Sequence, residues 1–466
     1  MNTSRSHVAA ELHRSCGVWA SGEESARAAV ATDFGGLTRK LPAVVVRPAD
    51  AAQVAAVLQY ANRHGLPVSV RAAAHSIGCQ TLSDDGILLE TSCLSRVWTP
   101  NVEQSCIEVE AGAKWSRVVA TALEQGFVPP VLTGTLGTTV GGTHSVAGLG
   151  HASYLHGSQV DNCLAMEVVT AQGDICWCDA QRRPELFEHV LCGLGQLAVI
   201  TRVRHRLRRH RPLVRRWRFN YRRLGEMLRD LEGLAAAGVG DYLSGYGFAV
   251  NGRFGYSIGA AFESDDDRQP EREAALAAIA PDVARGPIVQ SFAEFMVQQP
   301  TSDDRAARTP SHGMINPWID VLAPAAQIRS VLDGVLRCFP APLLRNATML
   351  FWPLFRQRFT RPLFMVPDAE RIILAGLYLT VANTELPAAL TALTAATERV
   401  AAAGGKRYVY AWMPFDAAGW AQHYGARWAA LCRLKAQYDP QMILNRGVIQ
   451  YGAAPASIAP AHAAAS

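Results

Sequence analysis

Lysine is nearly absent from this chain. Only Lys40, Lys114, Lys406 and Lys435 occur among its 466 residues, so arginine carries almost all of the positive charge. With 45 Lys and Arg against 40 Asp and Glu, the formal net charge is +5. A balance this modest does not by itself indicate a nucleic acid or a membrane surface as a partner.

Long apolar runs are also missing. No stretch approaches the eighteen or so uninterrupted apolar residues of a membrane-spanning helix, which excludes that class of protein. Residues 1–22 are interrupted by Ser, His, Glu and Arg and contain no apolar core of a secretory signal. The sequence therefore predicts a cytoplasmic protein with no membrane partner.

The cysteines lack the spacing of a disulfide framework or a metal site. Ten of them are scattered along the chain, and in a cytoplasmic protein we expect them to be reduced thiols. Cys176 and Cys178 form one close pair, but no second Cys or His pair follows at a ligand spacing. We therefore expect no metal.

A dinucleotide-binding signature is absent as well. No G-x-G-x-x-G follows a strand with an acidic residue about twenty positions later, which argues against a Rossmann domain. What remains is a chain with 49% hydrophobic and 18% charged residues, long enough for two globular domains with their own cores.

The first region contains a strand–helix–strand pattern. The apolar run 43–46 is followed by Asp50 as a helix start, a helix over Ala51 to His64, and a returning strand at 68–70. The loop that leaves this strand carries Ala72, Ala73 and Ala74, whose small side chains leave room for a ligand. His75 follows them, and its imidazole is a plausible covalent anchor, an acid or base, or simply a hydrogen-bonded structural residue.

A second loop is rich in glycine and threonine. Residues 133–143 read Thr-Gly-Thr-Leu-Gly-Thr-Thr-Val-Gly-Gly-Thr, which suits backbone N–H groups that approach a diphosphate. Farther along, the periodicity predicts helices over Tyr221 to Ala237 and Leu386 to Ala403, and strands over Tyr246 to Val250 and Ile373 to Thr380. We expect an antiparallel sheet with helices on one face.

These segments resemble the vanillyl-alcohol oxidase superfamily with its PCMH-type FAD-binding domain. The loop Arg71-Ala72-Ala73-Ala74-His75-Ser76 is most similar to that of the cytokinin dehydrogenases, which reads Arg-Gly-Arg-Gly-His-Ser. Other segments follow in the family's order, among them Asp33-Phe34-Gly35, Gly141-Gly142-Thr143, Asn316-Pro317-Trp318 and Tyr438-Asp439-Pro440.

The resemblance implies an α+β, two-domain flavin oxidase fold. It implies a discontinuous FAD-binding domain over 1–205, a substrate-binding cap over 206–412, and a segment over 413–466 that returns to the FAD domain. FAD would be bound covalently through His75, with no second link, because no cysteine lies between Cys106 and Cys163. The other residues implied to bind FAD are Val70, Ala72, Ala73, Ala74, Ser76, Gln80, Gly134, Thr139, Ser145, Leu149 and Ile200.

The chain departs from the cytokinin dehydrogenases at two carboxylates. Gly134 stands where that branch has the aspartate of Trp-Thr-Asp-Tyr-Leu, and Ser244 stands where it has the glutamate of Tyr-Val-Glu-Gly. Loss of a general base typically costs two to four powers of ten in rate. His144, Tyr242 and Tyr246 are candidate catalytic replacements, with loop hydrogen bonding or aromatic core packing as the structural alternatives.

Three functions stay open. The first is an FAD-linked oxidase or dehydrogenase that acts on a small amine or alcohol in specialised metabolism, with oxygen or another electron acceptor. The second is cytokinin-like amine oxidation with a relocated base, and the third is a flavin-binding or basic interaction protein without catalysis. The arginine run over 202–218 fits a solvated strand face better than a nucleic-acid surface. The sequence does not indicate an oligomeric state.

Overall fold

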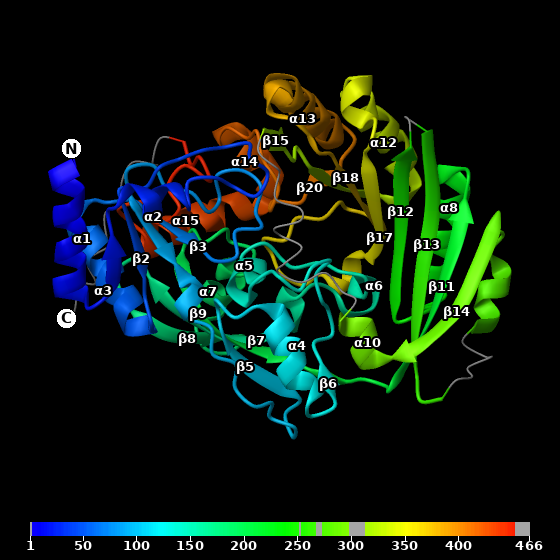
Figure 1. Ribbon diagram of the computed structural model, residues 1–466, viewed down its shortest axis with the longest axis horizontal. Helices are drawn as coiled ribbons and strands as arrows, with labels where there is room; N and C mark the ends of the chain where they lie inside the picture. Colours follow the sequence, from blue (N-terminus) through cyan, green and yellow to red (C-terminus); the bar gives the residue numbers. More distant parts are fainter. Residues whose placement is uncertain (1, 251–252, 267–272, 298–312, 453–466) are drawn as a thin grey trace, which may run out of the picture.

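The computed structural model describes residues 2–250, 253–266, 273–297 and 313–452. Helices and mostly antiparallel sheets build two lobes, with the N-terminal helix on one lobe and a large sheet in the other (Figure 1). The predicted α+β class is confirmed. Among the helices of these ranges, none combines the length and apolar character needed to cross a membrane.

The first lobe contains the predicted strand–helix–strand unit. Helix α3 (Ala51–His64) joins β2 (Val44–Arg47) to β3 (Val68–Arg71), and both strands pair in parallel with β4 (Ile87–Glu90). Asp50 caps α3 by accepting a 2.8 Å hydrogen bond from the Gln53 N–H, and Gly65 ends the helix at φ +63°. The neighbouring elements are α1 (Asn2–Cys16), β1 (Trp19–Ser21) and α2 (Glu24–Ala28).

A second sheet of the same lobe has the antiparallel order β5-β9-β7-β8. Its strands are β5 (Cys106–Glu110), β7 (Cys163–Thr170), β8 (Ile175–Asp179) and β9 (Ala198–Arg206). The surrounding short elements are α4 (Trp115–Leu123), β6 (Phe127–Val128), α5 (Val140–His144), α6 (Ser153–His156), α7 (Pro184–Val190) and β10 (Arg208–Arg209).

The start of the arginine run lies on β9. Arg204 and Arg206 are exposed while Val203 and His205 are buried, so the strand alternates as predicted. Arg204 also forms an ion pair with Glu108 on the neighbouring strand at 3.4 Å. This part of the run is a solvated strand face.

The second lobe is an eight-stranded antiparallel sheet with the order β14-β11-β13-β12-β17-β18-β16-β20. Its strands are β11 (Leu213–Tyr221), β12 (Tyr242–Val250), β13 (Arg253–Ser264), β14 (Val283–Ser291), β16 (Ile319–Pro324), β17 (Thr348–Phe355), β18 (Arg371–Tyr378) and β20 (Lys406–Arg407). A small pair, β15 (Met314–Ile315) and β19 (Val381–Ala382), and the helix α10 (Phe292–Val297) accompany it.

Three helices cover one face of this sheet, as predicted (Figure 1). They are α8 (Leu224–Ala236), α12 (Ile328–Leu336) and α13 (Leu386–Ala402). Apolar side chains such as Leu231, Leu332 and Leu393 pack into one core with Leu243 and Phe351 of the sheet. The opposite face of the sheet faces the space between the lobes.

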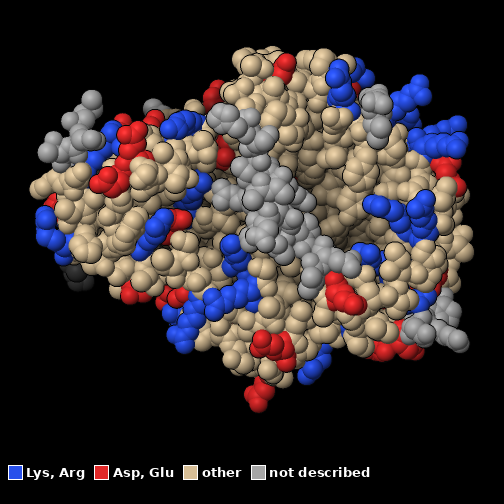
Figure 2. Space-filling view, in the orientation of Figure 1, with Lys and Arg blue, Asp and Glu red and all other residues tan. Residues whose placement is uncertain are grey.

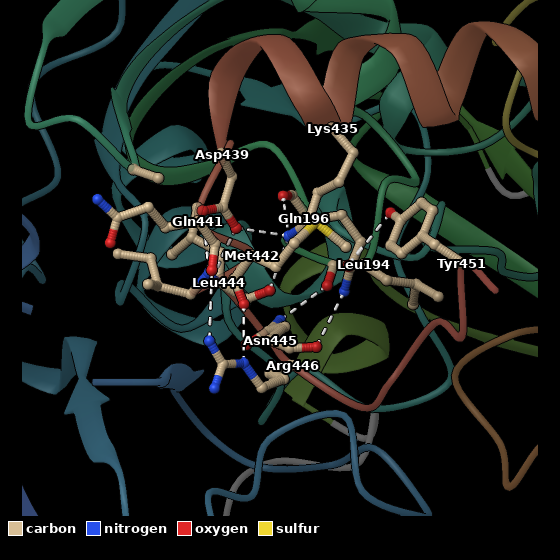
Figure 3. A network of polar contacts seen from close by, with 12 residues as sticks. Leu194, Gln196, Lys435, Asp439, Gln441, Met442, Leu444, Asn445, Arg446 and Tyr451 are labelled. Atoms are coloured by element: carbon tan, nitrogen blue, oxygen red, sulfur yellow. Dashed lines mark hydrogen bonds and ion pairs between the residues drawn. The ribbon is translucent and has the colours of Figure 1, made fainter. Parts of the chain in front are cut away.

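The last described segment packs against the first lobe through α14 (Ala417–Tyr424) and α15 (Trp428–Tyr438). The Val68 N–H donates to the Ile443 carbonyl, and the Asn445 N–H donates to the Val68 carbonyl, both at 2.8 Å. A buried Lys435–Asp439 ion pair of 2.6 Å holds this turn in place (Figure 3). Domain limits at 205 and 412 stay a proposal.

Candidate active site

A cavity of about 1130 Å³ lies between the His75 loop, the Gly/Thr loop and the inner face of the cap sheet. Figure 2 shows the surface hollowed between the two lobes. Every residue predicted to bind FAD lines this cavity, although those residues come from separate loops and strands. They are Val70, Ala72, Ala73, Ala74, His75, Ser76, Gln80, Gly134, Thr139, Ser145, Leu149 and Ile200.

Asp33 holds the His75 loop in place through its side-chain carboxylate. The Asp33 carboxylate accepts hydrogen bonds from the Gly78 N–H at 2.7 Å and the Leu37 N–H at 2.9 Å. Burial raises the pKa of Asp33 to about 6. The His75 ring stacks on Phe34 with 5.4 Å between centroids, so it stands fixed in the cavity wall.

The loop reaches its shape through a left-handed residue. Ala74 has φ +53°, a conformation that favours glycine, and the resembling family has glycine at this place. On the far side of the loop, the Ile77 N–H donates to the Tyr410 carbonyl at 2.9 Å, and the Gln80 amide donates to the Ala411 carbonyl at 2.8 Å. The segment around Tyr410 is thereby tied to the His75 loop.

His144, one of the three predicted catalytic residues, does not line the cavity. Its ring is fully buried beside Trp115 and His205, and its Nδ1 lies 2.8 Å from the carbonyl of Val140, one helical turn earlier. Burial lowers its pKa to about 4. The structure thus places the ring of His144 in the core and not at the cavity, because the turn of α5 directs it there.

A histidine that sequence reasoning missed lies there instead. His151 lines the cavity, with its Nδ1 2.5 Å from the Ser244 hydroxyl and 3.5 Å from the Tyr246 hydroxyl. Burial lowers the pKa of His151 to about 4, so the ring is neutral near pH 7. Its only sequence signal is its place just after Leu149 and Gly150, in a loop without periodicity.

The indole of Trp352 lies next to Gly134 and Ser244, the two positions at which the cytokinin dehydrogenases have carboxylates. The Trp352 Nε1–H donates to the Ser244 hydroxyl at 3.0 Å. A Cβ built on Gly134 would lie 3.9 Å from the Trp352 ring. Trp352 therefore lies beside both positions, and no acid–base pair of the cytokinin dehydrogenase type is present there.

The two predicted tyrosines follow the expected alternation, and Tyr242 and Tyr246 both line the cavity. The Tyr242 hydroxyl is engaged with Arg208 and Glu263, at 2.9 Å each. The Tyr246 hydroxyl faces His151. Burial raises the pKa of Tyr246, and a hydrogen bond from Ser244 and the positive charges of nearby arginines act against that rise. Tyr246 is thus the better placed of the two to touch a substrate.

The cavity wall contains one acidic residue among those that the structure describes, Asp320 on β16. Its carboxylate accepts hydrogen bonds from the Tyr410 hydroxyl at 2.6 Å and the Tyr378 hydroxyl at 3.0 Å. Burial raises the pKa of Asp320 to about 6, against the effect of both hydrogen bonds. A lone acid in the apolar strand Ile319-Asp320-Val321 was the signal that could have revealed it.

The strand register of the cap sheet places Tyr246 and Asp320 in one row. Tyr246 pairs with Leu350, Leu350 with Gly376, and Gly376 with Asp320, so all four lie in one row across the strands. At about 4.8 Å per strand, the ends of this row are about 14 Å apart. This row thus has the Asp320 cluster at one end, Tyr246 with His151 at the other, and an apolar surface between them.

Comparison with known families places this cavity in context. The family described as "FAD binding domain" matches residues 42–179, and the family described as "Cytokinin dehydrogenase 1, FAD and cytokinin binding" matches residues 289–449. An uncharacterized oxidoreductase in the fasciation locus of Rhodococcoides fascians is 30% identical, over 92% of this chain and 98% of its own. Cytokinin dehydrogenase 4 of Arabidopsis thaliana is 26% identical over 90% of both chains.

Solved structures share the fold. The 6-hydroxy-D-nicotine oxidase of Arthrobacter nicotinovorans superposes with a TM-score of 0.71 and 22% identity, over 92% of this chain and 96% of its own. The carbohydrate oxidase of Microdochium nivale gives a TM-score of 0.78 with 15% identity, over 95% and 99%. The predicted two-domain flavin oxidase fold is confirmed.

Proposed function

The chain belongs to the family of FAD-dependent oxidoreductases that includes the cytokinin dehydrogenases, and from this premise we propose how its own residues act. We propose that it removes a hydride from a C–H next to an amine or alcohol of a small molecule, in specialised metabolism. The observation that carries this proposal is the buried Asp320 carboxylate in the cavity wall, hydrogen-bonded to Tyr410 and Tyr378. It supplies an acid–base group where Gly134 and Ser244 supply none.

The cavity fits FAD. The flavin, when bound, accepts the hydride and passes electrons to oxygen or another acceptor. The small residues 72–74 leave room beside the backbone, and the hydroxyl-rich loop 133–139 offers donors to a diphosphate. We propose that His75 would hold the flavin covalently through a ring nitrogen, because the histidine is held in the wall by Phe34 and its loop by Asp33.

Tyr410 and Asp320 would manage the substrate's proton. The Tyr410 hydroxyl would accept the proton of the substrate's N–H or O–H while its own proton passes to Asp320. Tyr378 donates to the second carboxylate oxygen and so fixes the orientation of Asp320. With a pKa of about 6, Asp320 is ionised near neutral pH and ready to receive that proton.

His151, Tyr246 and Trp352 would then contact the body of the substrate. A neutral imidazole and two aromatic rings offer hydrogen bonding beside an apolar surface.

A cytoplasmic location remains a prediction, and the free thiol of every one of the ten cysteines agrees with it.

The second candidate is amine oxidation of the cytokinin dehydrogenase type with a relocated base. The match of residues 289–449 to the cytokinin-binding family favours it, and Asp320 would be the relocated carboxylate. A flavin-binding protein without catalysis is the third candidate. The desolvated carboxylate in the cavity wall speaks against it, because such a group is costly to keep without a role.

The visible spectrum of the purified protein tests this proposal. We expect a yellow protein whose colour stays with the precipitate after acid treatment, and we expect His75→Ala to release or lose it. His7→Ala, on the exposed face of α1, is the matched control and should keep the colour. Anaerobic bleaching of the flavin by an amine or alcohol would then identify a substrate class. A colourless protein with no flavin would overturn the proposal.

A further inference from the structure

Three arginines line the end of the cavity that lies beyond Tyr246. Arg216 and Arg218 come from β11, and Arg285 comes from the neighbouring edge strand β14. Positively charged side chains gather beside the hollow on the cap lobe (Figure 2). We propose that these three residues bind an oxyanion and that the substrate is therefore a small molecule that carries a carboxylate or a phosphate. This inference rests on the proposed function.

Ion pairing separates these arginines from their neighbours in sequence. Arg208 pairs with Glu263 at 2.5 Å, and Arg215 pairs with Glu273 at 2.5 Å. Within the ranges that the structure describes, no Asp or Glu lies within ion-pair distance of the three arginines on the cavity wall. Outside the cavity wall, five arginines of the run form ion pairs and Arg206 and Arg209 form none, whereas no arginine in the cavity wall forms one among the described residues.

The pairing of β11 with β14 brings two of these uncompensated charges together, which destabilises the sheet. Arg218 lies directly opposite Arg285 in the antiparallel pair of β11 and β14. Like charges directly opposite each other destabilise a sheet. An oxyanion between two guanidinium groups would reverse that repulsion, and the planar guanidinium fork suits the geometry of a carboxylate or phosphate.

The surroundings of the arginines suit the rest of such a molecule. Ile288, Phe248 and Phe295 line the same end of the cavity and offer an apolar surface. From β11 to β16 the sheet order counts five steps, which is about 24 Å between strands at 4.8 Å each. If the reacting C–H lies near Asp320, the substrate is elongated, with its anionic group at the far end.

Calorimetric titration tests the anion preference without turnover. The probes are 4-phenylbutyrate and its neutral isostere 4-phenylbutyramide, with phenyl phosphate to compare phosphate with carboxylate. We expect the parent to bind an anionic probe at least tenfold more tightly than the amide at low salt, and this preference to shrink as salt rises. The double variant R218Q/R285Q should lose the preference. R253Q, at an exposed site on β13 outside the cavity, should keep it.

Thermal unfolding supplies a second measurement. Because Arg218→Gln removes a like-charge contact, we expect its Tm to rise, whereas a merely structural arginine would give a lower Tm when replaced. Equal affinities for the anions and the amide in the parent, or an unchanged preference in the double variant, would overturn the inference. If the protein contains flavin, that result leaves the proposed function standing. A protein without flavin overturns the proposed function whatever the affinities are.

Discussion

The hydroxyl of Tyr410 donates a 2.6 Å hydrogen bond to the buried carboxylate of Asp320, across 90 residues of sequence. The contact forms because the chain around Tyr410 continues from β20, which pairs with β16. The backbone of Tyr410 also accepts a hydrogen bond from Ile77, two residues beyond His75. The short segment that follows β20 thus connects the proposed acid–base group to the proposed flavin anchor.

Gly376 leaves the space in which this group fits. A Cβ at this position would lie 2.5 Å from the Tyr378 hydroxyl and 2.7 Å from a carboxylate oxygen of Asp320. We expect Gly376→Ala to displace both side chains and lower kcat/KM about tenfold or more, since misplaced catalytic groups are costly. Gly233→Ala on α8, where a Cβ would meet nothing within 4 Å, should leave kcat/KM unchanged. Parent-like activity of Gly376→Ala would contradict the role of this cluster.

Substitution of His144 at the end of α5 and of His151 in the loop beyond it should separate activity from stability. His151→Gln should lower kcat/KM, because His151 faces the cavity, while flavin content and Tm change little. His144→Gln should lower Tm, because its ring packs in the core between Trp115 and His205, while the remaining folded enzyme keeps its kcat. Steady-state kinetics and thermal unfolding of both variants provide the comparison. The reverse pattern would restore His144 as the catalytic candidate.

Ala74 stores backbone strain in the flavin loop. At φ +53° an alanine costs about 1 to 2 kcal/mol more than a glycine. Glycine also adds entropy to the unfolded chain, which offsets part of this strain. We therefore expect Ala74→Gly to raise the free energy of unfolding by a net amount of about 0.5 to 1 kcal/mol. Ala73→Gly, at a residue without a positive φ, should lower it by a similar amount. Urea unfolding measures both, and a destabilised Ala74→Gly protein would speak against the strain.

Only part of the candidate site could be predicted from the sequence. Ala72 to Ser76 lie in one continuous loop whose small side chains follow a recognisable order, so their place in the cavity wall was predictable from the sequence, and FAD binding by them stays a proposal. Asp320 and Tyr410 were not, because only the pairing of β16 with β20 brings them together. His144 was misplaced for a related reason, since its position in a loop does not tell which side of a short helix faces the cavity.

Burial of Lys435 makes the closing segment sensitive to one charge. Its ammonium group is almost inaccessible and donates to Asp439, the Gln196 carbonyl and the Leu444 carbonyl within 3 Å (Figure 3). Lys435→Met would leave the Asp439 carboxylate buried without its partner, which typically costs about 3 to 5 kcal/mol. We expect a much lower urea midpoint and loss of flavin, because Asn445 of the same network lines the cavity.

Lys114→Met is the matched control for this change. Lys114 is exposed and forms no ion pair among the described residues, so the urea midpoint should stay near that of the parent. Similar midpoints for the two variants would mean that the buried pair contributes little to the stability of the closing segment.

The rate of anaerobic flavin bleaching in a single turnover tests the central claim most directly. With the first amine or alcohol that bleaches the parent, the rate should rise with pH through about 6, because Asp320 accepts the proton only when it is ionised. Asp320→Asn should keep its flavin, lose that inflection and react about 100 to 10,000 times more slowly, whereas Asp333→Asn on the exposed face of α12 should behave like the parent. An Asp320→Asn protein that bleaches at the parent's rate with the same pH profile would contradict the account.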